Sequence, residues 1–392
     1  MAIEGRSDTH AGRIRLGMVG GGQGAFIGAV HRIASRIDDR FALLAGALSS
    51  TPEKARASAA EIGLDPARSY GSYEEMATAE RDRDDGIEAV AIVTPNHMHF
   101  PVAKTFLEAG FHVICDKPMT TTLAEAKSLA AIAETSGRVF VLTHNYTGYP
   151  MIRQARAMIA AGDLGPIRMV VAEYAQDWLA TRAEDAGSKQ AGWRVDPTKA
   201  GAGGAIGDIG THAHNLACYV TGLRVEKLSA DLTAFVPGRR LDDNASMLLR
   251  FAGGAKGMLW ASQVAVGNEN GLTLRIYGEK GGLEWAQEEP NKLWYTPLGE
   301  PKRLITRGGA GANQAAAAVS RIPPGHPEGY LEGFATIYAE AAELIRAARD
   351  GIKPPAGIAL PTIADGVDGL AFIEACVASS KQDGAWVSLE HG

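Results

Sequence analysis

The sequence from residue 13 to residue 25 reads RIRLGMVGGGQGA. The part from Arg13 to Gly20 is short and mostly apolar, which predicts a buried strand. A glycine-rich stretch follows it, and the residues from Gly24 to Ser35 predict a helix. A strand, a tight glycine turn and a helix in this order are typical of the unit that opens a doubly wound α/β domain.

The spacing of the glycines suits a nucleotide phosphate. Gly20, Gly22 and Ala25 fit the G-x-G-x-x-G/A form, in which glycine permits a tight turn and a close approach of the backbone to a pyrophosphate. Gly24 and Gly28 leave open which residue packs the helix against the strand. A glycine-rich turn without a ligand is the alternative, and the strand–turn–helix context argues against it. We therefore expect a dinucleotide to contact Gly20, Gly22, Gln23, Gly24, Ala25 and Phe26.

Apolar runs and helical segments alternate as far as residue 145. Such alternation predicts a parallel sheet with helices on both faces. Thr122 and Glu125 form a capping-box pair at the start of one of these helices. The expected strands are 41–48, 87–94, 112–115 and 139–143, and the expected helices are 52–63, 73–80, 101–109 and 122–136.

The pattern changes after residue 145. Several strands follow one another without helices between them, which predicts a large, mostly antiparallel sheet. We therefore expect a Rossmann domain over residues 1–145 and an α+β domain over residues 146–392, whose C-terminal helix packs back on the first domain. The expected strands are 167–176, 228–236, 245–251, 255–264, 272–277 and 282–285; the helices are 150–161, 208–220, 329–349 and 362–382, and 306–324 is a long loop.

The composition limits the class of protein. Hydrophobic residues make up 46% of the 392 residues and charged residues 21%, which is ordinary for a globular chain and argues against disorder. The net charge of −6 does not favour nucleic acid or an anionic membrane as a partner. Three widely spaced cysteines form no metal motif, and the polar start of the chain has no signal-peptide pattern, so we expect a cytoplasmic protein.

The end of the second predicted strand bears on the choice of cofactor. An acidic residue at this place binds the adenosine ribose and selects NAD. This chain has Ser49 and Ser50 there, with Lys54 a turn later. Serine can donate to a 2′-phosphate and Lys54 supplies positive charge, so we expect NAD(P) with NADP(H) slightly favoured. The alternative is that Ser49 only caps the next helix and that the enzyme uses NAD or both cofactors.

Three distant residues carry the chemistry. Lys117 follows a parallel strand at its carboxyl end, where open α/β sheets bind ligands, and its ammonium can stabilise an alkoxide. Asp208 and His212 are four residues apart, which places them one turn apart if a helix begins at Asp208. His212 is a candidate general base, and Asp208 could also be an N-cap. We expect His214 to be structural, and the spacing matches no metal motif.

Together these motifs resemble the glucose-fructose oxidoreductase / inositol dehydrogenase / rhizopine catabolism protein (Gfo/Idh/MocA) family of NAD(P)-dependent oxidoreductases. The resemblance covers nearly the whole chain, and it rests on the order and spacing of the pieces. The matching pieces are Gly20–Gly24, Thr94–His99, Asp116–Pro118, Gly203–His212, and the closing segments Asp365-Gly366, Glu374-Ala375 and Trp386-Val387.

The resemblance implies a Rossmann domain, and a second domain whose open sheet builds a homodimer or homotetramer. It implies that Lys117, Asp208 and His212 form the catalytic group. It also implies that Thr94, Pro95, Asn96 and His99 line the nicotinamide side, with Asp116, His144 and Asn145 nearby. The chain departs from the family in having Asp116 where glutamate is usual, and in a glycine loop about two residues longer.

The resemblance further implies oxidation of a secondary hydroxyl of a sugar, anhydrosugar or cyclic polyol. We expect His212 to take the hydroxyl proton, Lys117 to hold the oxygen and Asp208 to orient His212 and a neighbouring hydroxyl; Lys117 as the base is the alternative. An NADPH-dependent carbonyl reductase and a nucleotide-binding regulator without turnover are rival functions. Further candidates for substrate contact are Tyr146, Tyr149, Trp178, Trp193, Arg194 and His326.

Overall fold

The N-terminal domain is built on a parallel sheet. The computed structural model describes residues 12–390. Five parallel strands lie in the order β2-β1-β3-β4-β5, which confirms the predicted doubly wound sheet. The strands are β1 (Ile14–Gly20), β2 (Phe41–Ala47), β3 (Ala89–Val93), β4 (His112–Cys115) and β5 (Phe140–Leu142); the helices are α1 (Phe26–Ile37), α2 (Pro52–Glu61), α3 (Tyr73–Arg81), α4 (His99–Glu108) and α5 (Leu123–Ser136).

The glycine loop between β1 and α1 requires glycine at several places. Gly20, Gly21 and Gly24 have φ values of 80°, 72° and 78°, which side chains rarely tolerate. A Cβ atom on Gly28 would lie 2.3 Å from the carbonyl oxygen of Gly21, so Gly28 is the residue that lets α1 pack closely on the loop. This contact settles the role that the sequence left open between Gly24 and Gly28.

The C-terminal half carries a nine-stranded sheet in the order β13-β12-β11-β10-β6-β9-β8-β7-β14. Its pairs are antiparallel except for β6 with β9, which confirms the predicted mostly antiparallel sheet. The strands are β6 (Ile167–Ala175), β7 (Val225–Thr233), β8 (Asn244–Phe251), β9 (Lys256–Ser262), β10 (Gly271–Gly278), β11 (Gly281–Ala286), β12 (Lys292–Pro297), β13 (Arg303–Thr306) and β14 (Val387–Ser388).

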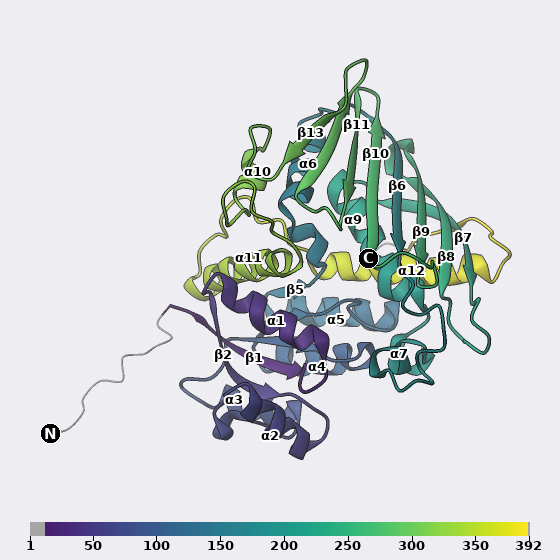
Figure 1. The fold of residues 1–392 in the computed structure, drawn as a ribbon. Coiled ribbons are helices and arrows are strands. Elements are labelled where there is room, and N and C mark those ends of the chain that lie inside the picture. The colour runs from purple at the N-terminus through teal and green to yellow at the C-terminus, as the bar shows by residue number, and fades with distance from the viewer. Residues whose placement is uncertain (1–11, 391–392) are drawn as a thin grey trace.

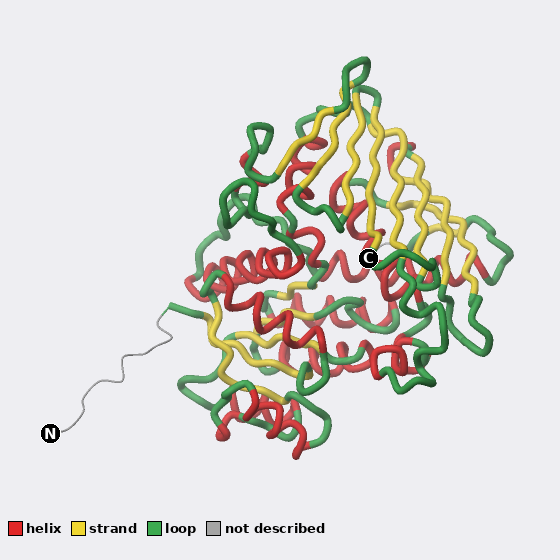
Figure 2. The backbone as a smooth tube through the Cα atoms, viewed as in Figure 1, coloured by secondary structure: helices red, strands yellow, loops and turns green. Residues whose placement is uncertain are grey.

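Helices cover one face of this sheet and tie it to the N-terminal domain. The sheet stands over the N-terminal domain, and α12 (Ile363–Ser380) runs between them (Figure 1). This helix packs against β7 on one side and α5 on the other. Helix α9 (Thr211–Thr221) packs against α12 and β6, and α6 (Pro150–Ala160) packs against α9, so these helices lie on one face of the sheet (Figure 2). The opposite face of the sheet has no helix in the described chain.

The chain returns to the N-terminal domain near its end. Helix α11 (Tyr330–Asp350) packs against α1, and Tyr338 on α11 makes a 2.8 Å hydrogen bond to Nδ1 of the buried His31 on α1. Arg321, just before α11, forms an ion pair with Asp38 at the end of α1. The two domains are therefore joined by both polar and apolar contacts. They share one continuous interior and are not connected by a linker alone.

Several local predictions differ from the structure. Helical turns begin at Ile206, in a π-helical stretch that runs to Gly210, so Asp208 lies inside the helix and is not its N-cap. Strands β12 to β14 and the short helices α7 (Lys189–Arg194), α8 (Pro197–Ala200) and α10 (Gln314–Ala317) had no clear sequence pattern. Thr122 does cap α5 by accepting from the backbone of Glu125, but the Glu125 carboxylate binds Thr121 instead of closing the box.

The expected cytoplasmic location rested in part on the polar start of the chain, which has no signal-peptide pattern. The polar start of the chain lies almost wholly outside the described residues. Across residues 12–390, no helix has both the length and the apolar character that a membrane crossing needs.

Candidate active site

A cavity of about 1120 Å³ lies where the two domains meet. It runs from the glycine loop and the end of β2, past the ends of β3 and β4, to the start of α9 and the ends of β6 and β10. The candidate residues that line it are Gly20, Gly22, Gln23, Gly24, Ala25, Phe26, Ser49, Ser50, Lys54, Thr94, Pro95, Asn96, Asp116, Lys117, Asn145, Tyr146, Trp178, Trp193, Arg194, Asp208 and His212.

Four sequence candidates lie outside this lining. His99 is buried, with Nδ1 at 2.6 Å from the carbonyl oxygen of Pro118 and Nε2 at 2.9 Å from that of Thr94, so it joins two loops beneath the cavity. His144 packs edge-on against His212, and Tyr149 packs between Tyr146 and Trp285. His326 is exposed in the loop before α11, and the structure does not bring it to the cavity.

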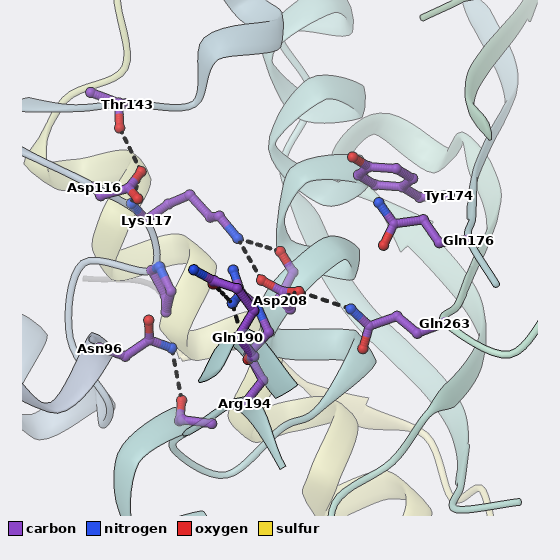
Figure 3. A network of polar contacts seen from close by, with 12 residues as sticks. Asn96, Asp116, Lys117, Thr143, Tyr174, Gln176, Gln190, Arg194, Asp208 and Gln263 are labelled. Carbon is purple, nitrogen blue, oxygen red and sulfur yellow. Dashed lines mark hydrogen bonds and ion pairs between the residues drawn. The ribbon is translucent and has the colours of Figure 1, made fainter. Parts of the chain in front are cut away.

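The carboxylate of Asp208 is the centre of the polar contacts in the cavity (Figure 3). Lys117 donates from Nζ to Oδ1 at 3.1 Å and to the backbone carbonyl oxygen of Asp208 at 2.5 Å. Nε of Arg194 and Nε2 of Gln263 donate to Oδ2 at 3.0 and 2.8 Å. The carboxylate therefore joins four segments of the chain. Among the described contacts it makes no hydrogen bond to His212, although the sequence suggested that it orients this ring.

Asp242 holds the turn that presents Asp208. Its carboxylate accepts from the backbone of Gly204 at 2.6 Å and of Ile206 at 2.8 Å, and its own carbonyl oxygen accepts from Ala205. A Cβ on Gly204 would lie 2.0 Å from that carbonyl oxygen, so glycine is needed there. Asp242 thus satisfies the free N–H groups at the start of the helical segment, as an N-cap would, but from a distant loop.

The charges around Asp208 and His212 set their protonation. Burial alone would raise the pKa of Asp208, but the positive charges of Arg194 and Lys117 hold it well below its usual range. Burial lowers the pKa of His212 well below its usual range, and the charge of Lys117 and the ring of His144 lower it further. At neutral pH Asp208 is an anion and His212 is a neutral ring.

His212 is placed to exchange a proton with a molecule in the cavity. Its ring lies 4.9 Å from the ring of Tyr146 and 5.4 Å from that of His144. Its Nδ1 is buried without a hydrogen-bond partner among the described residues, which leaves Nε2 as the nitrogen available to a substrate. His214, two residues along, instead stacks on Phe372 with 4.1 Å between ring centroids, as a structural residue does.

The other end of the cavity fits a nicotinamide dinucleotide. A Cβ on Gly22 would lie 2.5 Å from the carbonyl oxygen of Leu48, so glycine is needed where the loop packs on the residue that follows β2. Helix α1 starts at Phe26 without a side-chain cap, which leaves N–H groups for an anion. Farther in, Thr94 Oγ1 and Asn145 Nδ2 are buried without partners in the described chain. The described residues contain no cluster of three or more side chains suited to a metal ion.

Comparison with known proteins agrees with this geometry. Residues 14–144 match the model of an oxidoreductase family with an NAD-binding Rossmann fold, and residues 152–284 match the GFO/IDH/MocA C-terminal domain. The chain belongs to the GFO/IDH/MocA oxidoreductase family. The resemblance seen in the sequence is thereby confirmed.

Three relatives show how far the likeness extends. The structure of an oxidoreductase from Sinorhizobium meliloti is 60% identical with a TM-score of 0.88, covering 96% of this chain and 99% of that chain. An inositol dehydrogenase homologue from Azotobacter vinelandii, complexed with NADH and myo-inositol, is 38% identical with a TM-score of 0.90, covering 96% and 98%. Levoglucosan dehydrogenase from Pseudarthrobacter phenanthrenivorans is 28% identical, covering 96% and 98%.

Sequence reasoning missed a set of amides and a tyrosine in this GFO/IDH/MocA site. The hydroxyl of Tyr146 lies 2.6 Å from that of Tyr174, which donates to Oδ1 of Asn270 at 2.7 Å. Gln176 donates to the same oxygen, and Asn270 donates to Gln287. Gln176 ends a predicted strand and Asn270 precedes another. A polar residue at the end of a strand was a signal by which the sequence could have shown them as candidates for the site. Gln263 lies inside the predicted strand 255–264 and gave no such signal, whereas in the structure it directly follows the end of β9.

We expect Asp242 to make stability depend on pH. Burial raises the pKa of Asp242 to about 6. At pH values between the ordinary pKa of an aspartate and 6, Asp242 carries a proton in the folded protein but has released it in the unfolded chain. The contribution of this group to stability is therefore present below that range and is lost as pH rises through 6. Asp242→Asn removes the titration, so the melting temperature of the wild type minus that of the variant should fall from pH 4 to pH 6.

Asp196→Asn is the matched control. Asp196 caps α8, and its hydrogen bonds to Thr198 lower the pKa of its carboxyl. The difference in melting temperature for this variant should stay flat from pH 4 to pH 6. Calorimetry on the three proteins makes the comparison, and a difference for Asp242→Asn that is constant with pH would contradict the prediction.

Proposed function

We propose that this protein is a nicotinamide-dependent dehydrogenase that reversibly oxidises a secondary hydroxyl of a sugar, anhydrosugar or cyclic polyol. The observation that carries the proposal is the placement of Lys117, Asp208 and His212 at the inner end of a cavity whose outer end is a dinucleotide loop. The relatives crystallised with NADH and myo-inositol, or named for levoglucosan, support a cyclic polyol or anhydrosugar as substrate.

The cavity offers neutral polar groups suited to a polyol. Its substrate end combines aromatic rings (Tyr146, Tyr174 and Trp178) with the amides of Gln176 and Asn270, whose side chains form one hydrogen-bonded set. Flat apolar rings suit the C–H faces of a sugar ring, and amides can both donate to and accept from hydroxyls. The cations at this end, Lys117 and Arg194, are already paired with Asp208. A neutral substrate therefore fits better than a phosphorylated or carboxylated one.

Three residues of the chain have separate roles in the proposed reaction. A bound nicotinamide supplies the hydride acceptor. Lys117 donates one N–H to the Asp208 carboxylate and one to its carbonyl oxygen, so a third N–H remains to bind the reacting oxygen and stabilise its negative charge. Asp208 keeps the ammonium in this position. His212, neutral at physiological pH, takes the hydroxyl proton as the carbonyl forms.

Replacing His212 tests this division. Wild-type protein should reduce a nicotinamide cofactor with some member of a panel of cyclic polyols and anhydrosugars. His212→Ala should lower kcat by about 10²- to 10⁴-fold, the usual contribution of a general base, and added imidazole should restore part of the rate. Melting temperature serves as the control for folding. Wild-type turnover by His212→Ala across the pH range would instead leave Lys117 as the base.

The adenosine end of the cavity supports a preference for NADP(H). Ser49, Ser50 and Lys54 line it at the end of β2, where no carboxylate follows the strand directly. Lys54 forms no ion pair among the described residues, so its charge is available to a 2′-phosphate. The inositol dehydrogenase homologue and levoglucosan dehydrogenase were crystallised with NADH, and the preference proposed here is specific to the side chains of this protein.

Exchanging the charge at this end tests the preference. Lys54→Ala should raise KM for NADP+ by about ten-fold, because a contact worth about 1.4 kcal/mol is lost, and should leave KM for NAD+ within about two-fold. Ser49→Asp should reduce activity with NADP+ further, since a carboxylate repels the phosphate. A wild-type enzyme that works mainly with NAD+, together with a Lys54→Ala enzyme unchanged toward NADP+, would contradict the preference.

The uncovered face of the large sheet supports a homo-oligomer. Leu248 on β8 pairs with Met258 on β9, which in turn pairs with Val171 on β6, so the three side chains form an apolar row across that face. Leu248 and Met258 are 50% and 51% exposed, and Trp294 on β12 is 37% exposed. An apolar sheet face of this kind marks a protein interface more often than a solvated surface.

We expect a dimer or tetramer in solution that depends on this row. Met258→Glu should place a charge in the centre of the contact and lower the molar mass measured by light scattering toward that of one chain. Arg168→Glu changes the charge of an exposed residue on β6 whose one ion pair among residues 12–390 is with Glu279, and it should leave the mass unchanged. A wild-type mass of 41.2 kDa, that of one chain, would contradict the proposal.

A further inference from the structure

A segment of the C-terminal domain crosses to the N-terminal domain beside the cavity. It leaves β6, carries α7 and α8, and returns to the helix of Asp208. Helix α8 packs on the turn Asn96–Met98 of the N-terminal domain, and Asn96 donates to the carbonyl oxygen of Ala200 at 3.0 Å (Figure 3). The segment is therefore fixed to both domains, and what α7 presents to the cavity is held in place.

The two ends of α7 face different parts of the cavity. At its start, Lys189 lies over the glycine loop, since a Cβ on Gly24 would be 3.6 Å from Lys189 Nζ. At its end, Arg194 binds Asp208. Between them Gln190 accepts from Arg194, and the guanidinium of Arg194 lies 4.2 Å from the ring centroid of Trp193. A helix of this length spans about 9 Å, so its two ends contact different residues of the cavity lining.

Near the glycine loop, Lys189 is the lysine that forms no hydrogen bond or ion pair among the described contacts. The cationic side chains lining the cavity are Lys54, Lys117, Lys189 and Arg194. Lys117 and Arg194 are bound to Asp208, and Lys54 lies on α2, which follows β2 and not the glycine loop. Arg32, beneath the loop, donates to the carbonyl oxygen of Gly21 and so supports the backbone. Lys189 is exposed and has no hydrogen bond or ion pair within residues 12–390.

A lysine ammonium would add a full positive charge to the partial charges that the glycine loop and the start of α1 offer to a diphosphate. Helix N-termini and backbone N–H groups stabilise phosphate by partial charges only. Some of those N–H groups are already used, because Gln23 N–H donates to Ser58 Oγ and Gly22 N–H to the carbonyl oxygen of Leu48. A lysine ammonium beside Gly24 can supply this full charge and, unlike a residue of the loop, comes from the other domain.

We propose that Lys189 binds the diphosphate of the dinucleotide cofactor, so that α7 of the C-terminal domain contributes a charged contact to the cofactor end of the site. Because Arg194 on the same helix holds Asp208, a bound cofactor stabilises the arrangement of the catalytic carboxylate. Lys189 is thus a cofactor-binding residue, and α7 joins the cofactor end of the site to the substrate end. The inference rests on the proposed function only in requiring that a nicotinamide dinucleotide binds.

Equilibrium binding of NADH and NADPH tests the role of Lys189 without turnover. Lys189→Ala should raise the Kd of every dinucleotide that the wild type binds by about ten-fold, because the diphosphate is common to both. Lys189→Arg keeps the charge and should stay within about three-fold of wild type. The Kd of Lys189→Ala should also rise less steeply with salt concentration, since one charge contact has been removed.

Lys54→Ala is the matched control, because it removes a lysine from the same cavity at the ribose end. It should weaken NADPH and leave NADH unchanged, whereas Lys189→Ala should weaken both. The melting temperature of cofactor-free Lys189→Ala should equal that of wild type, because the side chain is exposed and unpaired. ADP-ribose, which has the diphosphate and lacks nicotinamide, should show the same loss as NADH.

The outcomes separate this inference from the proposed function. A Lys189→Ala protein that binds NADH and NADPH within two-fold of wild type overturns the role of Lys189 and leaves the dehydrogenase proposal standing. A loss confined to NADPH would assign Lys189 to the 2′-phosphate and also overturn it. A wild-type protein that binds neither dinucleotide would remove the basis of both proposals.

Discussion

The buried carboxylate of Asp208 is the contact on which the site depends. It accepts from Lys117 of the N-terminal domain and from Arg194 and Gln263 of the C-terminal domain, so one anion fixes the relative position of the two. An isolated buried carboxylate is costly, and paired cations with full hydrogen bonding make this one stable. The same pairing holds Asp208 as an anion, which is why the proposed mechanism gives the proton transfer to His212 and the binding of the reacting oxygen to Lys117.

The domains form one interior because the chain passes between them repeatedly. Helix α11 packs on α1, α12 lies between α5 and the large sheet, and the segment with α7 and α8 docks beside the cavity. The site is therefore not assembled by closing two separate bodies in this structure. Its parts are held by packing on both sides, and Arg194 is fixed by hydrogen bonds to Asp208 and Gln190.

Much of this architecture was predictable from local sequence. The glycine loop, the buried apolar strands and their alternating helices specify the N-terminal sheet, and successive alternating strands specify the second sheet. The predicted Lys117 and Asp208 do meet, 3.1 Å apart, although 91 residues separate them. The structure changes the role expected for Asp208. Its carboxylate binds Lys117, and it makes no hydrogen bond to His212 among the described contacts.

The sequence by itself determined the class of fold, the dinucleotide loop and the identity of the central residues, because each depends on local periodicity, glycine conformation or a short motif. Tertiary structure decided which side chains share the cavity. His326 lies outside it, and Tyr149 and His144 pack behind it. Asn270 and Lys189 line it from a strand end and a short helix, and Gln263 binds Asp208 from another strand end. Those positions follow from sheet register and domain packing, which bring together residues far apart in the chain. Such contacts produce no periodic pattern in the sequence, so they cannot be predicted from it.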